Sequence, residues 1–237
     1  HPDITRAGEY VFRTSFLGEI QGKAGAKLLG EMMGKKKVVI VTLQNDFGKS
    51  LAAGFKEKAS AYGINIVNEY QYSIKDRQFG SIVAKVKADN PDAIYASGYY
   101  FTAGPLVSQL RAAGVTCPVI GQEGYDSQKF IEIAGPAAEG VIITTSLDRD
   151  SKVPETADFI AAFEKQAGFK SDMVAASGHT AVMVAADAIK RAGSTDPAKV
   201  LAAIGKEVRV LVFRNGETET LRVTLGRRED EERAVPA

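Results

Sequence analysis

The sequence predicts an α/β fold: a doubly wound, parallel, five-stranded sheet with helices on both faces. Five short runs rich in β-branched residues lie roughly 25 residues apart, which leaves room for one crossover helix between parallel strands. The runs are apolar at consecutive positions, as in strands that are covered on both faces. Helical periodicity occupies three of the intervals between them. Together these observations predict an open sheet whose ligand crevice lies at the carboxyl ends of the strands.

The expected strands come in order along the first part of the chain. The first, with Val38, Val39, Ile40 and Val41 in succession, shows the consecutive apolar pattern most clearly. The five ranges are Val38–Leu43, Ile64–Tyr70, Ala93–Ala96, Pro118–Gly121 and Val141–Thr145.

Three helices are expected between these strands, each closed by a turn signal. They are predicted over 50–62, which Gly63 follows, over 80–88, which Asn90-Pro91 follows, and over 105–113, which Gly114 follows. Glycine ends helices because it adopts the left-handed conformation, and proline is favoured at a first helical position. Pro105 is therefore read as the start of the third helix.

After Thr145 the pattern changes. Three helices without intervening strands are predicted over 154–166, 178–192 and 197–204. Two β-rich runs, 208–214 and 217–225, flank Asn215-Gly216, a strong hairpin signal. The resulting division is an α/β ligand-binding domain over 1–145, a helical segment over 146–204, a hairpin over 205–226 and a charged tail over 227–237.

Composition excludes several classes of protein and site. Thirty basic and 29 acidic side chains leave a net charge of +1, so no basic surface for nucleic acid is expected. No apolar run reaches the roughly 18 residues that span a bilayer. The single Cys117 and the two histidines cannot build a disulfide framework or a histidine-rich metal site. No phosphate-binding loop is present, so no nucleotide cofactor is expected. The chain shows no signal peptide, and His1 is read as a processed terminus or the start of a fragment.

Side chains that follow the strands are expected to line the crevice. Among them Glu123 offers a carboxylate to an ammonium group, Tyr99 an aromatic face and a hydroxyl, and Phe47 an apolar wall. Each has an ordinary alternative: a solvated loop acid, a packed tyrosine, and a packing residue where a helix begins. An acid/base pair of Asp46 with Glu123 is a further alternative.

An ordered set of short motifs resembles the type I periplasmic solute-binding proteins of branched-chain amino acid (Leu/Ile/Val) ABC importers. The likeness extends over about residues 1–204. The motifs are Val11-Phe12-Arg13-Thr14, Gln21-Gly22, Asn45-Asp46-Phe47-Gly48, Tyr95-Ala96-Ser97-Gly98-Tyr99, Gly121-Gln122-Glu123-Gly124, Ala138-Glu139-Gly140 and Ala192-Gly193-Ser194-Thr195-Asp196-Pro197.

The resemblance implies a non-enzymatic, two-lobed receptor that closes on an amino acid and delivers it to an ABC permease. It implies a periplasmic or extracellular location and no cofactor. In this family the second lobe supplies an aromatic residue after the first strand, a tyrosine after the third and a glutamate after the fourth. These positions correspond to Phe47, Tyr99 and Glu123. The helical segment 146–204 would be the return into the first lobe.

Two departures from the family pattern carry expectations of their own. Most of the first lobe would precede His1, so half of the site is expected to be missing and the helix stripe with Phe159, Ala162 and Phe163 is expected to promote self-association. The last 30 or so residues resemble the closing hairpin of an HtrA-type PDZ domain, which suggests a chimera. The alternative function is therefore an engineered or recombined structural domain without ligand binding. An enzyme of the flavodoxin-like class ranks third, because it would need a phosphate loop or an acid/base pair.

Overall fold

The chain folds into two compact units. The structure is a computed structural model that describes residues 2–204, 207–214 and 217–224. One unit comprises His1–Ile4 and Ser15–Ala176, and the other comprises Thr5–Thr14 and Ser177–Ala237. The boundary between residues 176 and 177 differs from the expected one between 145 and 146. The four-part division by resemblance stays a prediction, and its charged tail, 227–237, lies outside the described residues.

The first unit contains the predicted parallel sheet. Its strand order is β2-β1-β3-β4-β5, and all four pairings are parallel. This confirms the predicted fold class, and the strand bounds differ from the expected ones by two residues at most. The strands are β1 (Lys37–Leu43), β2 (Asn65–Tyr72), β3 (Ala93–Ala96), β4 (Val119–Gly121) and β5 (Val141–Ile143).

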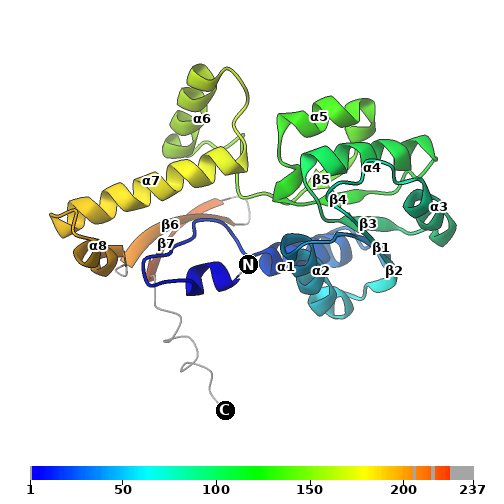
Figure 1. Ribbon diagram of the computed structural model, residues 1–237, viewed down its shortest axis with the longest axis horizontal. Coiled ribbons are helices and arrows are strands. Elements are labelled where there is room, and N and C mark those ends of the chain that lie inside the picture. Colours follow the sequence, from blue (N-terminus) through cyan, green and yellow to red (C-terminus); the bar gives the residue numbers. More distant parts are fainter. Residues whose placement is uncertain (1, 205–206, 215–216, 225–237) are drawn as a thin grey trace, which may run out of the picture. The chain divides into compact units, whose positions relative to one another are not determined.

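Helices cover both faces of this sheet (Figure 1). The first unit also holds short 3₁₀ or π turns at 28–32, 60–62, 123–125 and 135–138. The helices, some of which belong to the second unit, are α1 (Gly18–Lys27), α2 (Asp46–Ala59), α3 (Gly80–Asp89), α4 (Tyr100–Ala112), α5 (Gln128–Ala134), α6 (Pro154–Ala167), α7 (Met173–Ala192) and α8 (Pro197–Ile204).

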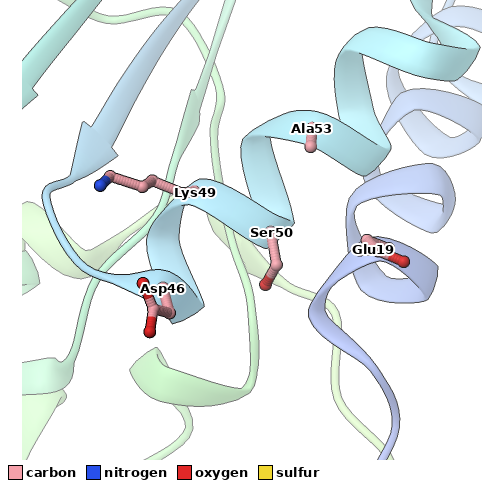
Figure 2. Close-up of a pocket in the computed structure, with 5 residues that line it drawn as sticks. All are labelled: Glu19, Asp46, Lys49, Ser50 and Ala53. Atoms are coloured by element: carbon pink, nitrogen blue, oxygen red, sulfur yellow. The ribbon is translucent and has the colours of Figure 1, made fainter. Parts of the chain in front are cut away.

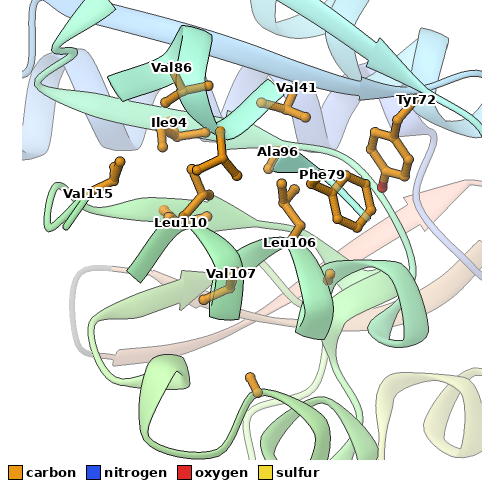
Figure 3. Packing of buried hydrophobic residues seen from close by; sticks show 14 of the residues in the cluster. Val41, Tyr72, Phe79, Val86, Ile94, Ala96, Leu106, Val107, Leu110 and Val115 are labelled. Carbon is orange, nitrogen blue, oxygen red and sulfur yellow. The ribbon is translucent and has the colours of Figure 1, made fainter. Parts of the chain in front are cut away.

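Strand β1 divides its side chains between two apolar layers because successive residues point to opposite faces. Val38 and Ile40 belong to a buried cluster with Phe55 of α2, on the face that α1 also covers. Val39 and Val41 belong to the other cluster, in which Leu106 of α4 and Phe79 take part (Figure 3). Burial on both faces explains the consecutive apolar residues in the sequence.

Three helices begin earlier than predicted. Helix α2 starts at Asp46 rather than Ser50, because the Asn45 Oδ1 atom accepts a hydrogen bond of 2.8 Å from the Gly48 N–H and caps the first turn. Helix α7 starts at Met173 rather than Gly178, where the Asp172 Oδ1 atom accepts from the Ala175 N–H. His179 therefore lies within a helix and not at its start.

Helix α4 corrects the reading of Pro105. The helix begins at Tyr100, and Pro105 lies inside it. The N–H groups of Thr102 and Ala103 already donate to the Tyr99 carbonyl, at 2.9 and 2.8 Å, so the first turn forms ahead of the proline. A proline at this position removes one intrahelical hydrogen bond without preventing the helix.

Helices α1 and α5 were not predicted. Helix α1 holds three glycines in ten residues, a composition that disfavours an isolated helix by about 1 kcal/mol per glycine. In the structure Gly22 faces the backbone of α2, where an added Cβ would collide with the Leu51 carbonyl oxygen. The glycines thus allow two helix backbones to pack closely.

The predicted hairpin forms a separate two-stranded sheet. Strands β6 (Glu207–Arg214) and β7 (Glu217–Thr224) pair antiparallel with Arg214 opposite Glu217. The predicted turn, Asn215-Gly216, lies outside the described residues. Among the helices that the structure describes, none has the length and apolar character to cross a bilayer.

Candidate functional site

The three predicted site residues lie at one edge of the sheet in the first unit. Phe47 is in the first turn of α2 after β1, and Tyr99 immediately precedes α4 after β3. Glu123 follows β4 and begins the short 3₁₀ turn Glu123–Tyr125. The carboxyl ends of parallel strands meet at the same edge, so the three loops are neighbours there.

Phe47 and Tyr99 form an aromatic wall. Their rings are stacked, with centroids 5.4 Å apart and an interplanar angle of 17°. Phe101 extends the stack, its ring centroid 5.7 Å from that of Tyr99, and the Arg77 guanidinium lies 5.0 Å from the Phe101 centroid. All three rings are half-buried, so each retains a face or edge in contact with solvent. Stacking of this kind is favourable, and Tyr99 and Phe47 also pack against the two buried apolar clusters.

Glu123 is a buried carboxylate with one oxygen hydrogen-bonded and the other without a hydrogen-bond partner among the described residues. The residue is 7% exposed. The Gln21 amide of α1 donates to Glu123 Oε2 at 2.7 Å, and the Glu123 backbone N–H donates to Gln21 Oε1 at 3.4 Å. Among the described residues, Glu123 Oε1 has no hydrogen-bond partner.

Burial dominates the electrostatics of this carboxyl group. Loss of solvent raises the pKa of Glu123 above its ordinary value of 4.5. The Ser146 hydroxyl and the Gln21 amide oppose this rise, and the nearby Asp126 carboxylate adds to it. The Ser146 groups lie near the carboxylate, but neither meets Oε1 with hydrogen-bond geometry. A cation beside Oε1 would supply the missing partner and favour the charged form.

The Gln122 side chain fixes the loop of Glu123 against the loop of Tyr99. The Gln122 amide donates to the Gly98 carbonyl at 3.0 Å, and its oxygen accepts from the Gly124 N–H at 2.7 Å. A Cβ added at Gly124 would collide with the same Gly98 carbonyl oxygen. The side chains of Tyr99 and Glu123 therefore extend from two loops in direct contact.

A second set of bonds fixes the β3 loop to its neighbours. The Tyr72 hydroxyl donates to the Ser97 carbonyl at 2.7 Å, and the Leu43 N–H donates to Ser97 Oγ at 2.9 Å. Burial raises the pKa of Tyr72 to about 12, so its hydroxyl remains a donor at neutral pH. Gly98 leaves space for this hydroxyl, which a Cβ would displace.

A partly buried ion pair lies near Glu123. Asp126 is 6% exposed, and its carboxylate accepts from Arg149 at 2.6 Å and from the Thr145 hydroxyl at 2.7 Å. Arg149 also donates to the Ser171 carbonyl at 3.0 Å. These bonds connect the segment after β5 to the sheet and explain why residues 146–176 belong to the first unit.

A small surface pocket lies beside these loops, between α1 and α2 (Figure 2). Its volume is about 260 Å³. None of the three predicted site residues lines it. The candidate site is therefore defined by Phe47, Tyr99 and Glu123 and not by this pocket. The lining residues are Glu19, Asp46, Lys49, Ser50 and Ala53.

The sequence alone gave no sign of a role for Gln21 or for the ion pair of Asp126 with Arg149. Gln21 appeared only as part of a motif, and it lies 102 residues from Glu123 along the chain. No pattern in a single sequence connects residues so far apart. Within the described part of the chain, no cluster of His, Cys, Asp or Glu side chains is arranged to hold a metal ion.

Comparisons with known proteins match this architecture. The family model described as periplasmic binding protein matches residues 4–230. A Leu/Ile/Val-binding protein homolog of Brucella melitensis is 32% identical over 202 residues, covering 85% of this chain and 54% of that protein. The crystal structure of a leucine-binding protein from Thermotoga maritima superposes with a TM-score of 0.78 at 28% identity, covering 93% of this chain and 69% of that one.

A third similar structure carries a different ligand. It is a solute-binding protein of an ABC transporter from R. palustris in complex with benzoate, with a TM-score of 0.79 at 25% identity over 93% of this chain and 67% of that one. The chain spans about half the length of the curated relatives it matches, 54% for the Brucella protein. The family match runs through the hairpin strands to residue 230. The extent of that match, together with the fold, shows that the chain belongs to the periplasmic binding protein family.

Proposed function

We propose that the chain is part of an extracytoplasmic solute-binding protein of an ABC importer that binds a branched-chain or related amino acid without catalysis. Glu123 pairs with the ligand's ammonium group, while Tyr99 contacts the same cation and Phe47 contacts the apolar part. The chain contributes the contacts of one lobe. We also propose a periplasmic or extracellular location and delivery of the ligand to an ABC permease.

The observation that carries this proposal is the buried Oε1 atom of Glu123, which has no hydrogen-bond partner among the described residues. A buried carboxylate oxygen without a donor is costly, by about 1–3 kcal/mol or more for a charged group, and a ligand ammonium removes that cost. The stacked rings of Phe47 and Tyr99 support a ligand with an apolar portion. Relatives named for leucine, isoleucine and valine binding agree with such a ligand.

The ligand class is open to a direct test, since benzoate binds a similar protein but has no ammonium group. We would titrate the isotopically labelled chain by NMR with L-leucine, with 4-methyl-2-oxopentanoate, its keto analogue, and with benzoate. Leucine alone is expected to shift the resonances of residues 97–101 and 122–124. One lobe gives few contacts, so the expected Kd is about millimolar, or roughly −4 kcal/mol.

Variants at two glutamates complete the test. Glu123→Gln keeps the shape but removes the charge, and it is expected to abolish the leucine-induced shifts. Glu132→Gln removes an exposed carboxylate paired with Lys129 and is expected to leave them unchanged. Equal effects of leucine and its keto analogue, or no effect of leucine, would contradict the proposal.

The alternative is a recombined structural domain with a hairpin similar to that of a PDZ domain and no ligand binding. It predicts no shifts with any of the three ligands. The family match that includes the hairpin range gives this alternative no separate support.

A further inference from the structure

We propose that Gln21 is a positioning residue of this binding site: its amide holds one oxygen of the Glu123 carboxylate so that the other oxygen is free for the ligand's ammonium. The proposal rests on the proposed function for the identity of the ligand. The geometry of the Gln21–Glu123 pair carries it, and that geometry can be tested without any ligand.

The contact is made at two points. The Gln21 amide N–H donates to Glu123 Oε2 at 2.7 Å, and the Gln21 amide oxygen accepts from the Glu123 backbone N–H at 3.4 Å. Two points of contact fix both the backbone and the carboxylate plane of Glu123. Gln21 is itself 7% exposed, so water does not compete for these groups.

The amide is suited to this task because it is neutral and both donates and accepts. A lysine or arginine in its place would neutralise the carboxylate and compete with the ligand's cation. A glutamate would bring a second negative charge beside Glu123 and would have no proton to donate when ionised. Glutamine orients the carboxylate and leaves its charge for the ligand.

Close packing of α1 against α2 brings Gln21 within hydrogen-bond distance of Glu123. Gly22, the next residue, faces the Leu51 carbonyl and the Phe55 N–H, and a Cβ there would overlap both. Gly54 of α2 likewise faces the backbone of Glu19. Helix α1 therefore lies against α2 at backbone contact distance, which holds Gln21 at the carboxyl edge of the sheet.

Asp126 and Ser146 also affect the pKa of Glu123, and both act independently of Gln21. Asp126 raises the pKa of the Glu123 carboxyl, but its own charge is bound by Arg149. The Ser146 hydroxyl and N–H favour the charged form from the segment after β5. A change at Gln21 leaves these groups in place, so its effect on Glu123 is separable from theirs.

The test is a carboxyl-carbon NMR titration of Glu123 without ligand. In Gln21→Met, which keeps the length but removes the amide, the Glu123 pKa is expected to rise by about one unit, because the lost hydrogen bond favours the charged form. Gln166→Met makes the same change on the exposed side of α6 and is expected to leave the Glu123 pKa unchanged. An unchanged Glu123 pKa in Gln21→Met would overturn the proposal.

A second variant, Gln21→Glu, keeps the test decisive if Gln21→Met does not fold. Gln21→Glu preserves the shape and places two carboxyl groups together, so the Glu123 pKa is expected to rise by more than in Gln21→Met. A purely structural role for Gln21 predicts lower stability with no such change in titration, and that result would reject positioning.

Measurements of leucine binding distinguish a failure of this inference from a failure of the proposed function. On the high-pH plateau that the ligand-free titration defines for each variant, Gln21→Met is expected to weaken leucine binding about tenfold and Gln166→Met not at all. If the unchanged chain fails to bind leucine, the proposed function fails, and the ligand-free titration still decides whether Gln21 holds Glu123. Full leucine affinity in Gln21→Met would overturn positioning while supporting the function.

Discussion

At the scale of single residues, the proposed role of Glu123 depends on its burial. The side chain is withdrawn from water, yet only one of its two oxygens has a hydrogen-bond donor among the described residues. An exposed loop glutamate would satisfy both oxygens with water and gain little from an ammonium. Whether Glu123 is a ligand-binding carboxylate or a solvated loop acid therefore depends on its burial, which the sequence does not show.

The raised pKa of Glu123 predicts a pH dependence of leucine binding. Under the proposed function the ligand's ammonium pairs with the charged carboxylate, so affinity is expected to fall as the pH is lowered through the raised pKa, at a pH above the ordinary value of 4.5. Calorimetric or NMR titrations over a pH series would measure this. Affinity that stays constant until an ordinary glutamate titrates would contradict it.

The raised pKa of Glu123 also makes the stability of the fold depend on pH, and this dependence is opposite to that of binding. Because burial favours the neutral carboxyl, the contribution of Glu123 to folding is greatest below pH 4.5 and is lost as the pH rises through the raised pKa. Acid therefore weakens binding while it relieves the cost of burying this charge. In Glu123→Gln this part of the pH dependence of unfolding is expected to disappear.

At the scale of elements, close packing of α1 on α2 depends on glycine. Gly22→Ala is expected to destabilise the first unit by about 1–3 kcal/mol, because its Cβ would overlap backbone atoms that cannot move independently. Urea unfolding followed by circular dichroism would measure the change. Gly80→Ala at the start of α3, where nothing lies within 4 Å, is the control and is expected to be neutral or slightly stabilising. Equal stability of the two variants would show that the glycine contact is unimportant.

The Arg149–Asp126 pair predicts a second effect on stability. Arg149→Met leaves the buried Asp126 with a single side-chain donor, Thr145, and is expected to cost about 2 kcal/mol. Lys129→Met breaks an exposed pair with Glu132 and is expected to cost less than about 1 kcal/mol. Thermal unfolding of both variants compares the two pairs. A cost for Arg149→Met no larger than that for Lys129→Met would contradict this ranking.

Capping explains two of the three helix starts that were predicted too late, those of α2 and α7. Asn45 and Asp172 are ordinary cap residues, but the apolar periodicity that follows them starts late, and the predictions followed periodicity. The start of α8 at Pro197 agrees with its prediction, because there the cap Asp196 and the proline directly precede the apolar run.

At the scale of the whole molecule, exposed apolar side chains on α7 predict self-association. Val182 is 67% exposed and Met183 is 55% exposed, whereas Phe159 and Phe163 of the expected stripe are half-buried against each other. Sedimentation velocity is expected to show dimers or larger species that increase with concentration. Val182→Lys is expected to reduce them, and Ala185→Lys at another exposed position of α7 tests charge alone. A monomer at every concentration would disprove self-association.

The sequence by itself determined the order of the strands along the chain and the parallel α/β class. It also determined that Phe47, Tyr99 and Glu123 follow strand ends. Periodicity and strand ends are visible in short stretches of consecutive residues. Only the tertiary structure decided that α1 is a helix, since its glycines are unfavourable until α2 lies against them. It likewise decided that Gln21 meets Glu123 and that residues 146–176 belong to the first unit. Contacts between distant residues depend on how the elements pack, and packing is not encoded in any short stretch of the chain.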